Sequence, residues 1–360
     1  MSFKRKYLSS DNNPYFIAEI GINHNGQMSL AKKMIEASKK AGAKAVKFQK
    51  RDIRALLAPG AVIVEPTGYL SKTEHDIPSG DKKAFGTWTY PDKRLELTDS
   101  QHLELWKYAE SIGLDYLISP WEEKSVDFLV KNKARIIKVA SIDANNYQFC
   151  EYIAKKRIPT IISTGMMNYA EIQTTWSIFE REKCPMMFLH CTSAYPSPVE
   201  DKHLRCIPVL RQLFSEDVGF SGHAIGVEGT LGAVALGANV IEKHVTLSRK
   251  MNGPDHAASL EFSELADLVR MSRNMVAALG KSQKSFLPSE KVLHGVLSRR
   301  FVTVKPVKAG ARLESALVTT MVTKKDGGIL PNQYFNILGL KVKKSLPKGY
   351  VLNYEDLMRE

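Results

Sequence analysis

The segment VGFSGHAIGVEGTLGAVALGANVIEKHV (Val218–Val245) has a short apolar run on each side of a helix-like stretch. The first run leads into His223, and the second contains His244. Runs that are apolar on both sides are typical of strands buried in a parallel sheet. Since parallel strands end at the same edge of a sheet, we expect the two imidazole rings to lie close together.

The same alternation of strand and helix patterns continues along the chain up to Leu260. Between the apolar runs lie amphipathic stretches such as SLAKKMIEASKKAG, and several of them end at or near Gly, a common helix stop. The eight runs are Tyr15–Gly21, Ala43–Gln49, Leu114–Pro120, Arg135–Ser141, Pro159–Gly165, Met186–Thr192, Val218–His223 and Asn239–Val245. Eight strand–helix units in about 250 residues predict a TIM (β/α)8 barrel. The polar stretch 51–97 is expected to be a loop over the catalytic face.

The character of the sequence changes after a helix predicted over Phe262–Leu279. We predict a barrel domain over residues 1–281, a polar linker over 282–298 and a small, mostly β domain over 299–360. Within this last domain, VKAGARL (307–313) and LPKGYVL (346–352) look like two copies of one turn. They predict an internal repeat.

The composition is that of an ordinary globular protein, with 44% hydrophobic and 25% charged residues in a chain of 360. No signal peptide and no membrane-spanning run is expected, so we predict a cytoplasmic protein with no membrane partner. Cys150, Cys184, Cys191 and Cys206 are expected to be reduced thiols. The net charge of +13 comes from scattered basic residues, which favours a site for small anions over a nucleic-acid surface.

Each predicted strand ends in a polar group, where TIM barrels carry their catalytic residues. These groups are Glu19, Lys47 with Gln49, Ser119, Lys138 with Ser141, Ser163 with Thr164, His190 with Thr192, Ser221 with His223, and Glu242 with His244. Burying an unpaired charge is costly, so two lysines inside apolar runs suggest a phosphate or carboxylate between them. The alternative is that each lysine forms a structural ion pair with Glu19 or Glu242.

The two histidines suggest a divalent metal site, because neutral imidazoles together with water or a substrate oxygen can bind such an ion. The alternative is a pair of core histidines bonded to backbone carbonyls. Their matched positions at the ends of neighbouring strands favour metal ligands.

Seven motifs together resemble the N-acetylneuraminate (sialic acid) synthase family, over nearly the whole chain from about Tyr15. They are AEIGINHNG, KFQK, STGM, LHCTSAYPSP, GFSGHAIG, IEKHVTL and NGPDHAASLE. The C-terminal segment is similar to the all-β antifreeze-like (SAF) domain of that family. The resemblance implies condensation of phosphoenolpyruvate with an N-acylmannosamine-type sugar to give a nonulosonic acid and phosphate. It also implies a domain-swapped homodimer in which the small domain caps the partner's site.

The resemblance assigns roles to individual residues. Positions that match phosphoenolpyruvate-binding residues are Lys47, Ser119, Lys138, Ser141, Ser163 and Ser221. His223 and His244 match the ligands of a divalent metal, Mn2+ or Mg2+. Glu19 matches a carboxylate near the reacting carbons. Positions expected to contact substrate are Gln49, Asp143, Tyr195, Asp255 and Lys324. Asp143 stands where some members have Glu. Lys324 and Lys325 are the nearest residues to an Arg that many bacterial members carry.

Other functions remain open on sequence grounds. A Schiff-base aldolase would use Lys138 without a metal. A metal-dependent hydrolase would use the histidine pair, and a binding role without catalysis would rest on the small domain and the basic charge. The acceptor sugar is equally open, between N-acetylmannosamine, its 6-phosphate and a diacetamido-trideoxy hexose such as a legionaminic acid synthase would use.

Overall fold

The computed structural model describes residues 2–9, 11–56, 63–64, 89–90, 95–215, 217–323 and 327–358. The chain forms two compact units, Met1–Gly280 and Lys281–Glu360. Across the described residues, no helix is both long enough and apolar enough to cross a membrane. All four cysteines are free thiols, as predicted.

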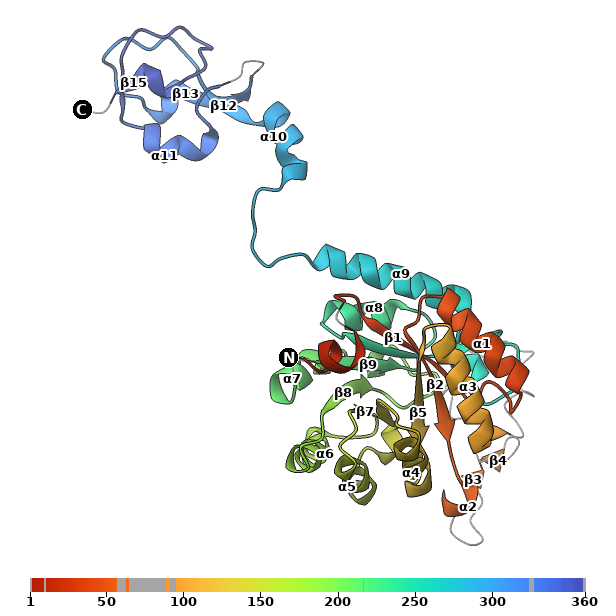
Figure 1. Cartoon of the computed structure of the whole chain (residues 1–360). Coiled ribbons are helices and arrows are strands. Elements are labelled where there is room, and N and C mark those ends of the chain that lie inside the picture. Colours follow the sequence, from red (N-terminus) through yellow and green to blue (C-terminus); the bar gives the residue numbers. More distant parts are fainter. Residues whose placement is uncertain are drawn as a thin grey trace. The chain divides into compact units, whose positions relative to one another are not determined.

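The first unit is a parallel (β/α)8 barrel, and its strands confirm the eight predicted runs (Figure 1). The strands are β1 (Tyr15–Gly21), β2 (Ala45–Lys50), β5 (Asp115–Pro120), β6 (Ile137–Val139), β7 (Thr160–Ser163), β8 (Met186–Cys191), β9 (Val218–Gly222) and β10 (Val240–Thr246). They pair in the order β5-β2-β1-β10-β9-β8-β7-β6, and β5 lies beside β6 to complete the ring.

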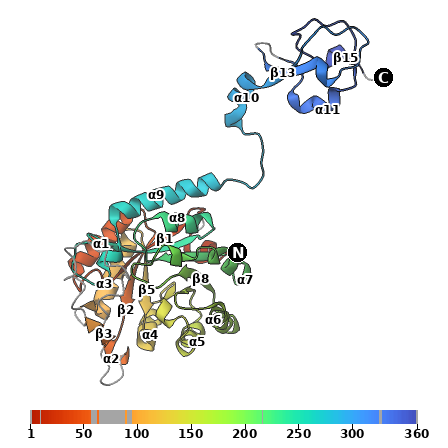
Figure 2. The ribbon, with the colours of Figure 1, turned by 180° about the vertical axis from the view of Figure 1, so that it is seen from behind.

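Helices cover the outside of the strands, as Figures 1 and 2 show from opposite sides. They are α1 (Met28–Lys40), α3 (Asp99–Ser111), α4 (Glu123–Lys131), α5 (Tyr147–Lys155), α6 (Tyr169–Arg181), α7 (Cys206–Leu213), α8 (Glu228–Ala235) and α9 (Phe262–Leu279). The bounds of α9 equal those predicted. Caps fix several helix starts: the Thr98 hydroxyl accepts from the backbone N–H of Gln101, and the Asn168 side chain accepts from that of Glu171.

Shorter elements connect the strands and helices of this unit. They are η1 (Lys4–Leu8), α2 (Ile53–Leu56), β3 (Ile63–Val64), β4 (Thr89–Tyr90), η3 (Ser141–Asp143), η4 (Glu200–Lys202), η5 (His256–Ala258) and β11 (Leu260–Glu261). In the predicted loop 51–97, β3 pairs with β4 in antiparallel fashion. Residues 57–62, 65–88 and 91–94 of that loop lie outside the described residues.

Alternation of side chains along the strands separates an outer layer from the barrel lumen. Outward side chains such as Phe48, Phe188 and Ile241 pack in the large cluster beneath the helices. A second cluster fills the amino-terminal part of the lumen and includes Ile17, Leu117, Ile161, Met187 and Leu189. Two residues beyond these apolar positions, toward the carboxyl end of each strand, the next inward side chain is polar, as in the step from Ile17 to Glu19. The barrel mouth, at the carboxyl ends of the strands, is therefore the polar end of the lumen.

In its described residues, the second unit has four short strands in two antiparallel pairs. Its elements are η6 (Pro288–Glu290), α10 (Lys291–Leu297), β12 (Arg299–Thr303), η7 (Ser315–Leu317), β13 (Val318–Val322), η8 (Pro331–Gln333), α11 (Tyr334–Ile337), β14 (Lys341–Val342), η9 (Tyr354–Asp356) and β15 (Leu357–Met358). Strand β12 pairs with β13, and β14 pairs with β15. The unit is not purely β, because it includes α10 and α11. Helix α10 lies in the stretch predicted to be a linker.

The predicted internal repeat is visible in this unit. Each copy has a glycine with positive φ, Gly310 at +80° and Gly349 at +77°, followed by a 3-10 helix and a strand. Glycine suits these positions because other residues rarely adopt such a backbone conformation. The backbone groups of Val307 and Leu346, which start the two copies, hydrogen-bond to each other in both directions.

Candidate active site

Lys47 lies at the centre of a buried charge cluster at the barrel mouth. Its Nζ is 3.1 Å from Glu19 Oε1 and 3.4 Å from Glu242 Oε1. It also donates to the Ser119 hydroxyl at 3.1 Å. Strand β1 pairs with both β2 and β10, which brings these three charged side chains together. The ion pairs considered as the structural alternative for Lys47 are therefore present.

Lys138 is bound mainly by uncharged oxygens. Its Nζ donates to the Ser163 hydroxyl at 2.7 Å and to the Val139 carbonyl at 2.9 Å. Glu242 Oε2 is 3.9 Å away, the limit of an ion pair, and this oxygen has no hydrogen-bond partner among the described residues. Lys138 thus has a weaker link to a carboxylate than Lys47 has.

Burial and mutual attraction shift the pKa values of these groups in different directions. Burial raises the pKa of Glu19 to about 7, against the attraction of Lys47. Burial lowers the pKa of Lys138 to about 8, with Glu242 acting in the opposite sense. Burial also opposes the charged forms of Lys47 and Glu242, but the opposite charges around them outweigh it. The carboxylates Glu19 and Glu242 raise the pKa of Lys47. The ammonium groups of Lys138 and Lys47 lower the pKa of Glu242.

Hydroxyl groups line the mouth next to the charges. Ser221 donates to Glu242 Oε1 at 3.3 Å, and Gln49 Nε2 is 3.5 Å from Glu19 Oε1. Ser141 Oγ accepts from the backbone N–H of Gly165 at 3.1 Å and contacts Cys191 Sγ at 3.4 Å. Together with Ser119 and Ser163, these groups surround the two ammonium groups with neutral donors and acceptors. Such a set suits an anionic ligand with several oxygens.

His223 and His244 lie side by side, with ring centroids 5.4 Å apart. His223 Nδ1 is 3.1 Å from the Thr192 carbonyl oxygen and 3.6 Å from Cys191 Sγ. Burial lowers the pKa of His244 well below its usual value, which keeps this ring neutral. Burial alone would lower the pKa of His223, but Cys191, the Thr192 carbonyl and Glu242 together outweigh it and raise that pKa.

The donor set at the histidine pair fits a metal ion. The buried Nδ1 of His244 has no hydrogen-bond partner in the described chain and lies 3.8 Å from Asp255 Oδ2. A ring separation of 5.4 Å lets two nitrogens share one ion at roughly 2.1 Å each. Within the described ranges, no group of three or more His, Cys, Asp or Glu side chains could hold an ion. A bound ion would therefore have positions open to water or substrate oxygens.

Tyr195 joins the histidine pair from the loop after β8. Its hydroxyl is 3.0 Å from His223 Nε2, and its ring centroid is 4.2 Å from that of His223 and 5.6 Å from that of His244. Burial of the hydroxyl end raises the pKa of Tyr195 well above its usual value. The loop thus places a phenol directly at the expected metal position.

Two predicted site residues are not joined to this group. Asp143 lies in η3, where burial raises its pKa to about 6, and no hydrogen bond or ion pair links its side chain to the described lysines or histidines. Lys324 lies outside the described residues. Conversely, sequence reasoning did not assign a site role to Cys191, which contacts both Ser141 and His223. It named Glu242 as a strand-end group and as an ion partner, but gave it no role in the site. The position of Glu242 two residues before His244 on the same strand was the available signal.

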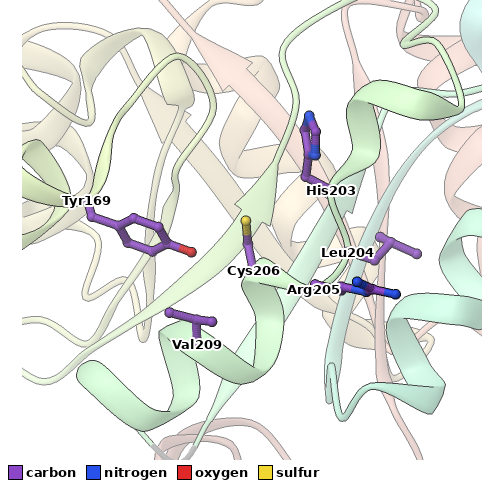
Figure 3. Close-up of a pocket in the computed structure, with 6 residues that line it drawn as sticks. All are labelled: Tyr169, His203, Leu204, Arg205, Cys206 and Val209. Carbon is purple, nitrogen blue, oxygen red and sulfur yellow. The ribbon is translucent and has the colours of Figure 1, made fainter.

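A separate cavity of about 470 Å³ lies between the starts of α6 and α7, outside the lumen. Figure 3 shows the hydroxyl of Tyr169 and the thiol of Cys206 facing the same space. None of the lysines, carboxylates or paired histidines of the barrel mouth lines it.

Comparison with known proteins gives a consistent result. The model of the NeuB family matches residues 34–284. The chain is 37% identical over 329 residues to the N-acetylneuraminate-9-phosphate synthase of Mus musculus, covering 91% of this chain and 88% of the mouse protein. It is 31% identical over 350 residues to the N,N'-diacetyllegionaminic acid synthase of Legionella pneumophila, covering 95% and 94%.

A solved structure is also similar. It is the N-acetylneuraminic acid (sialic acid) synthetase of Leptospira borgpetersenii, determined in complex with citrate. The TM-score is 0.67 at 30% identity, with 78% of this chain and 90% of that chain covered.

Proposed function

Because the chain belongs to the NeuB family, and is thus a carbon–carbon bond-forming sugar acid synthase, we propose that it condenses phosphoenolpyruvate with an amino sugar to give a nonulosonic acid and phosphate. The observation that carries this proposal is the set of side chains at the barrel mouth. Two buried lysines with serine partners lie beside a histidine pair suited to a divalent ion. One half of the mouth suits a phosphorylated carboxylate, and the other suits an aldehyde oxygen.

The lysines and serines have the chemistry to bind phosphoenolpyruvate. Lys47 and Lys138 would hold its phosphate and carboxylate, with Ser119, Ser163, Ser141 and Ser221 donating to the remaining oxygens. In the reaction, carbon 3 of phosphoenolpyruvate bonds to the aldehyde carbon, water adds at carbon 2, and the bond from carbon 2 to the phosphate oxygen breaks. The same ammonium groups then offset the negative charge of the departing phosphate.

The remaining groups would serve the sugar. His223 and His244 would hold a divalent ion, for which we propose Mn2+, and such an ion polarises the sugar aldehyde as a Lewis acid. Glu19 is the candidate for moving protons between water and the new hydroxyl, because burial raises its pKa to about 7. Tyr195 and Asp255 lie next to the histidines and would contact the sugar in this proposal.

The acceptor sugar is left open between related compounds. Three carbons of the product come from phosphoenolpyruvate, so a product phosphorylated at carbon 9, as named for the mouse relative, requires an acceptor phosphorylated at carbon 6. A legionaminic acid product, as named for the Legionella relative, requires a diacetamido-trideoxy hexose.

Phosphate release from phosphoenolpyruvate tests the proposal. The full chain with Mn2+ should release phosphate with one of three sugars and not with phosphoenolpyruvate alone. The panel is N-acetylmannosamine, its 6-phosphate and 2,4-diacetamido-2,4,6-trideoxymannose. Mass spectrometry of the product should show the sugar lengthened by three carbons. Failure with all three sugars would contradict the proposed substrate class.

The Glu19→Gln variant tests proton handling. Loss of a positioned acid–base group should lower kcat about a hundredfold, while the isosteric amide leaves phosphoenolpyruvate and Mn2+ binding near wild type. A limb of the wild-type pH profile near pH 7 should disappear in the variant, because Gln does not titrate. Gln49→Leu, which removes the neighbouring amide without removing a carboxylate, is the control and should retain that limb. An unchanged kcat in Glu19→Gln would remove Glu19 from the chemistry.

The Gly165→Ala variant tests the hydroxyl cradle. A Cβ at Gly165 would lie 2.1 Å from Ser193 Oγ and 2.7 Å from Ser141 Oγ, so both hydroxyls must move. We expect the KM for phosphoenolpyruvate to rise about tenfold, in line with an overpacking cost of roughly 1–3 kcal/mol. Gly232→Ala, in α8 on the outside of the barrel, is the control, since a Cβ there would meet only the flexible end of the Leu204 side chain, at 2.9 Å. A Gly165→Ala enzyme with a wild-type KM would place the anion elsewhere.

One observation favours a second candidate, the Schiff-base aldolase. Burial lowers the pKa of Lys138 to about 8, a property of lysines that attack carbonyl groups. Borohydride reduction in the presence of pyruvate separates the two mechanisms. An aldolase would gain a stable adduct on Lys138, whereas the proposed synthase would gain none.

We also propose that a homodimer covers the barrel mouth, the second unit being an SAF-like cap. Exposed apolar side chains follow three strand ends, namely Ile142 after β6, Met166 after β7 and Ile225 after β9. Helix α10 exposes a matching apolar set, Val292, Leu293, Val296 and Leu297. Analytical ultracentrifugation should give a dimer, and a Val292→Glu, Val296→Glu double variant should be monomeric.

A further inference from the structure

The proton positions at His223 follow from its hydrogen bonds. The Thr192 carbonyl oxygen, 3.1 Å from Nδ1, can only accept, so Nδ1 carries a proton. In the neutral ring, Nε2 then has the free lone pair. The Tyr195 hydroxyl lies 3.0 Å from Nε2, so the phenol donates to that lone pair.

The same lone pair is the one that a metal ion would need. An imidazole binds a metal through a deprotonated nitrogen, and the hydrogen bond on its other nitrogen fixes which one that is. Since Thr192 fixes Nδ1 as the donor, Nε2 is left for the ion. One lone pair cannot serve both the ion and the Tyr195 hydroxyl.

Tyr195 also occupies the space around both rings. Its ring lies 4.2 Å from that of His223 and meets that of His244 edge-on at 5.6 Å, with an interplanar angle of 84°. The residue as a whole is nonetheless 38% exposed, so solvent lies beside it. The backbone N–H of Ser197, two residues further on, is bonded to the His223 carbonyl at 3.2 Å. The backbone of this loop is thus tied down, and a side-chain rotation is the simplest way for the hydroxyl to leave.

We infer that Tyr195 is a positioning residue that occupies Nε2 of His223 in the metal-free enzyme and releases it when an ion binds. This inference rests on the proposed metal site. Release frees the phenol at the moment when the site is ready for the sugar, because Tyr195 then has a hydroxyl without its former partner. Binding of the ion and binding of the sugar are thereby coupled through one side chain.

Mn2+ binding to the full-length, substrate-free enzyme tests the inference without using activity. Free Mn2+ is counted by its electron paramagnetic resonance signal during a titration at pH 8. Tyr195→Phe keeps the ring and removes the hydroxyl, so its Kd for Mn2+ should be roughly threefold to tenfold lower than wild type, the usual net value of one hydrogen bond. Tyr195→Leu also lacks the hydroxyl and should bind Mn2+ more tightly than wild type.

Tyr169→Phe is the matched control. Tyr169 lines the outer cavity of Figure 3, so its Kd for Mn2+ should equal that of wild type. A wild-type or weaker affinity in Tyr195→Phe would overturn the inference, because the hydroxyl would then not compete with the ion. His223→Ala tests the metal site itself: if that variant binds Mn2+ as wild type does, His223 is not a ligand and the proposed metal site is wrong. If it loses Mn2+ while Tyr195→Phe is unchanged, only the role of Tyr195 fails.

Discussion

Replacing both His223 and His244 with alanine should lower the rate of condensation by about a thousandfold or more. Lewis-acid polarisation of a carbonyl contributes several kcal/mol to transition-state stabilisation, and each 1.36 kcal/mol is about a factor of ten. The double variant should still bind phosphoenolpyruvate, since the lysines and serines do not contact these rings through any described hydrogen bond. Steady-state phosphate release and a phosphoenolpyruvate titration measure the two effects.

Chelation of the wild-type enzyme is the companion experiment. Exhaustive dialysis against EDTA should abolish activity, and added Mn2+ should restore it in wild type but not in the double variant. His190→Ala is the matched control, because His190 is also a buried strand-end histidine, but its Nε2–H donates to the Lys202 carbonyl on the outward side of β8. Full activity of the double variant after chelation would contradict a metal-dependent mechanism at this site.

Lys138→Met should weaken phosphoenolpyruvate binding or transition-state stabilisation by roughly 2–5 kcal/mol, the cost of removing one partner from a buried charged hydrogen bond. Its stability should fall only modestly, because Glu242 keeps Lys47 at 3.4 Å. Lys47→Met should lose affinity too, but it leaves Glu19 and Glu242 without their nearest cation. The free energy of unfolding of that variant should therefore fall by about 3–5 kcal/mol.

A thermal melt and a phosphoenolpyruvate titration on each variant separate these outcomes. Because burial lowers the pKa of Lys138 to about 8, the wild-type affinity should decline as the pH rises through 8 and the ammonium is lost. Lys138→Met should lack that decline. Lys243→Met is the control: Lys243 is equally buried, but its Nζ donates to the Ala224 carbonyl on the outward side of β10. A Lys138→Met enzyme with normal phosphoenolpyruvate affinity and an early melt would make Lys138 purely structural.

The barrel could be predicted because its signal is local. Each apolar run marks a strand, and inward positions follow from the period of two, so Lys47 and Lys138 are assigned to the lumen without any coordinates. The proximity of His223 and His244 follows from the same reasoning, since β9 and β10 are neighbours in the sheet.

The contacts that could not be predicted depend on closure of the barrel and on loops with irregular backbone. Glu242 lies between the two lysines only because β10 pairs with β1, which joins the two ends of the barrel sequence. The contacts of Tyr195 and Gly165 arise in loops that have no periodic pattern. Helix α10 was missed because its short apolar stretch follows a polar segment and is not buried against the rest of its unit, so neither amphipathicity nor length distinguished it from a linker.

The repeat in the second unit has a consequence for how this unit unfolds. Hydrogen bonds link the two halves in both directions. Val307 and Leu346 bond each other, Gly349 donates to Thr303 just before the first copy, and Gly310 donates to Val342 just before the second. Each half thus supplies backbone partners to the other, and these bonds are lost when either half opens. Amide hydrogens in both copies should therefore exchange with deuterium together, as one cooperative unit, and a chain cut between the copies should lose protection on both sides of the cut.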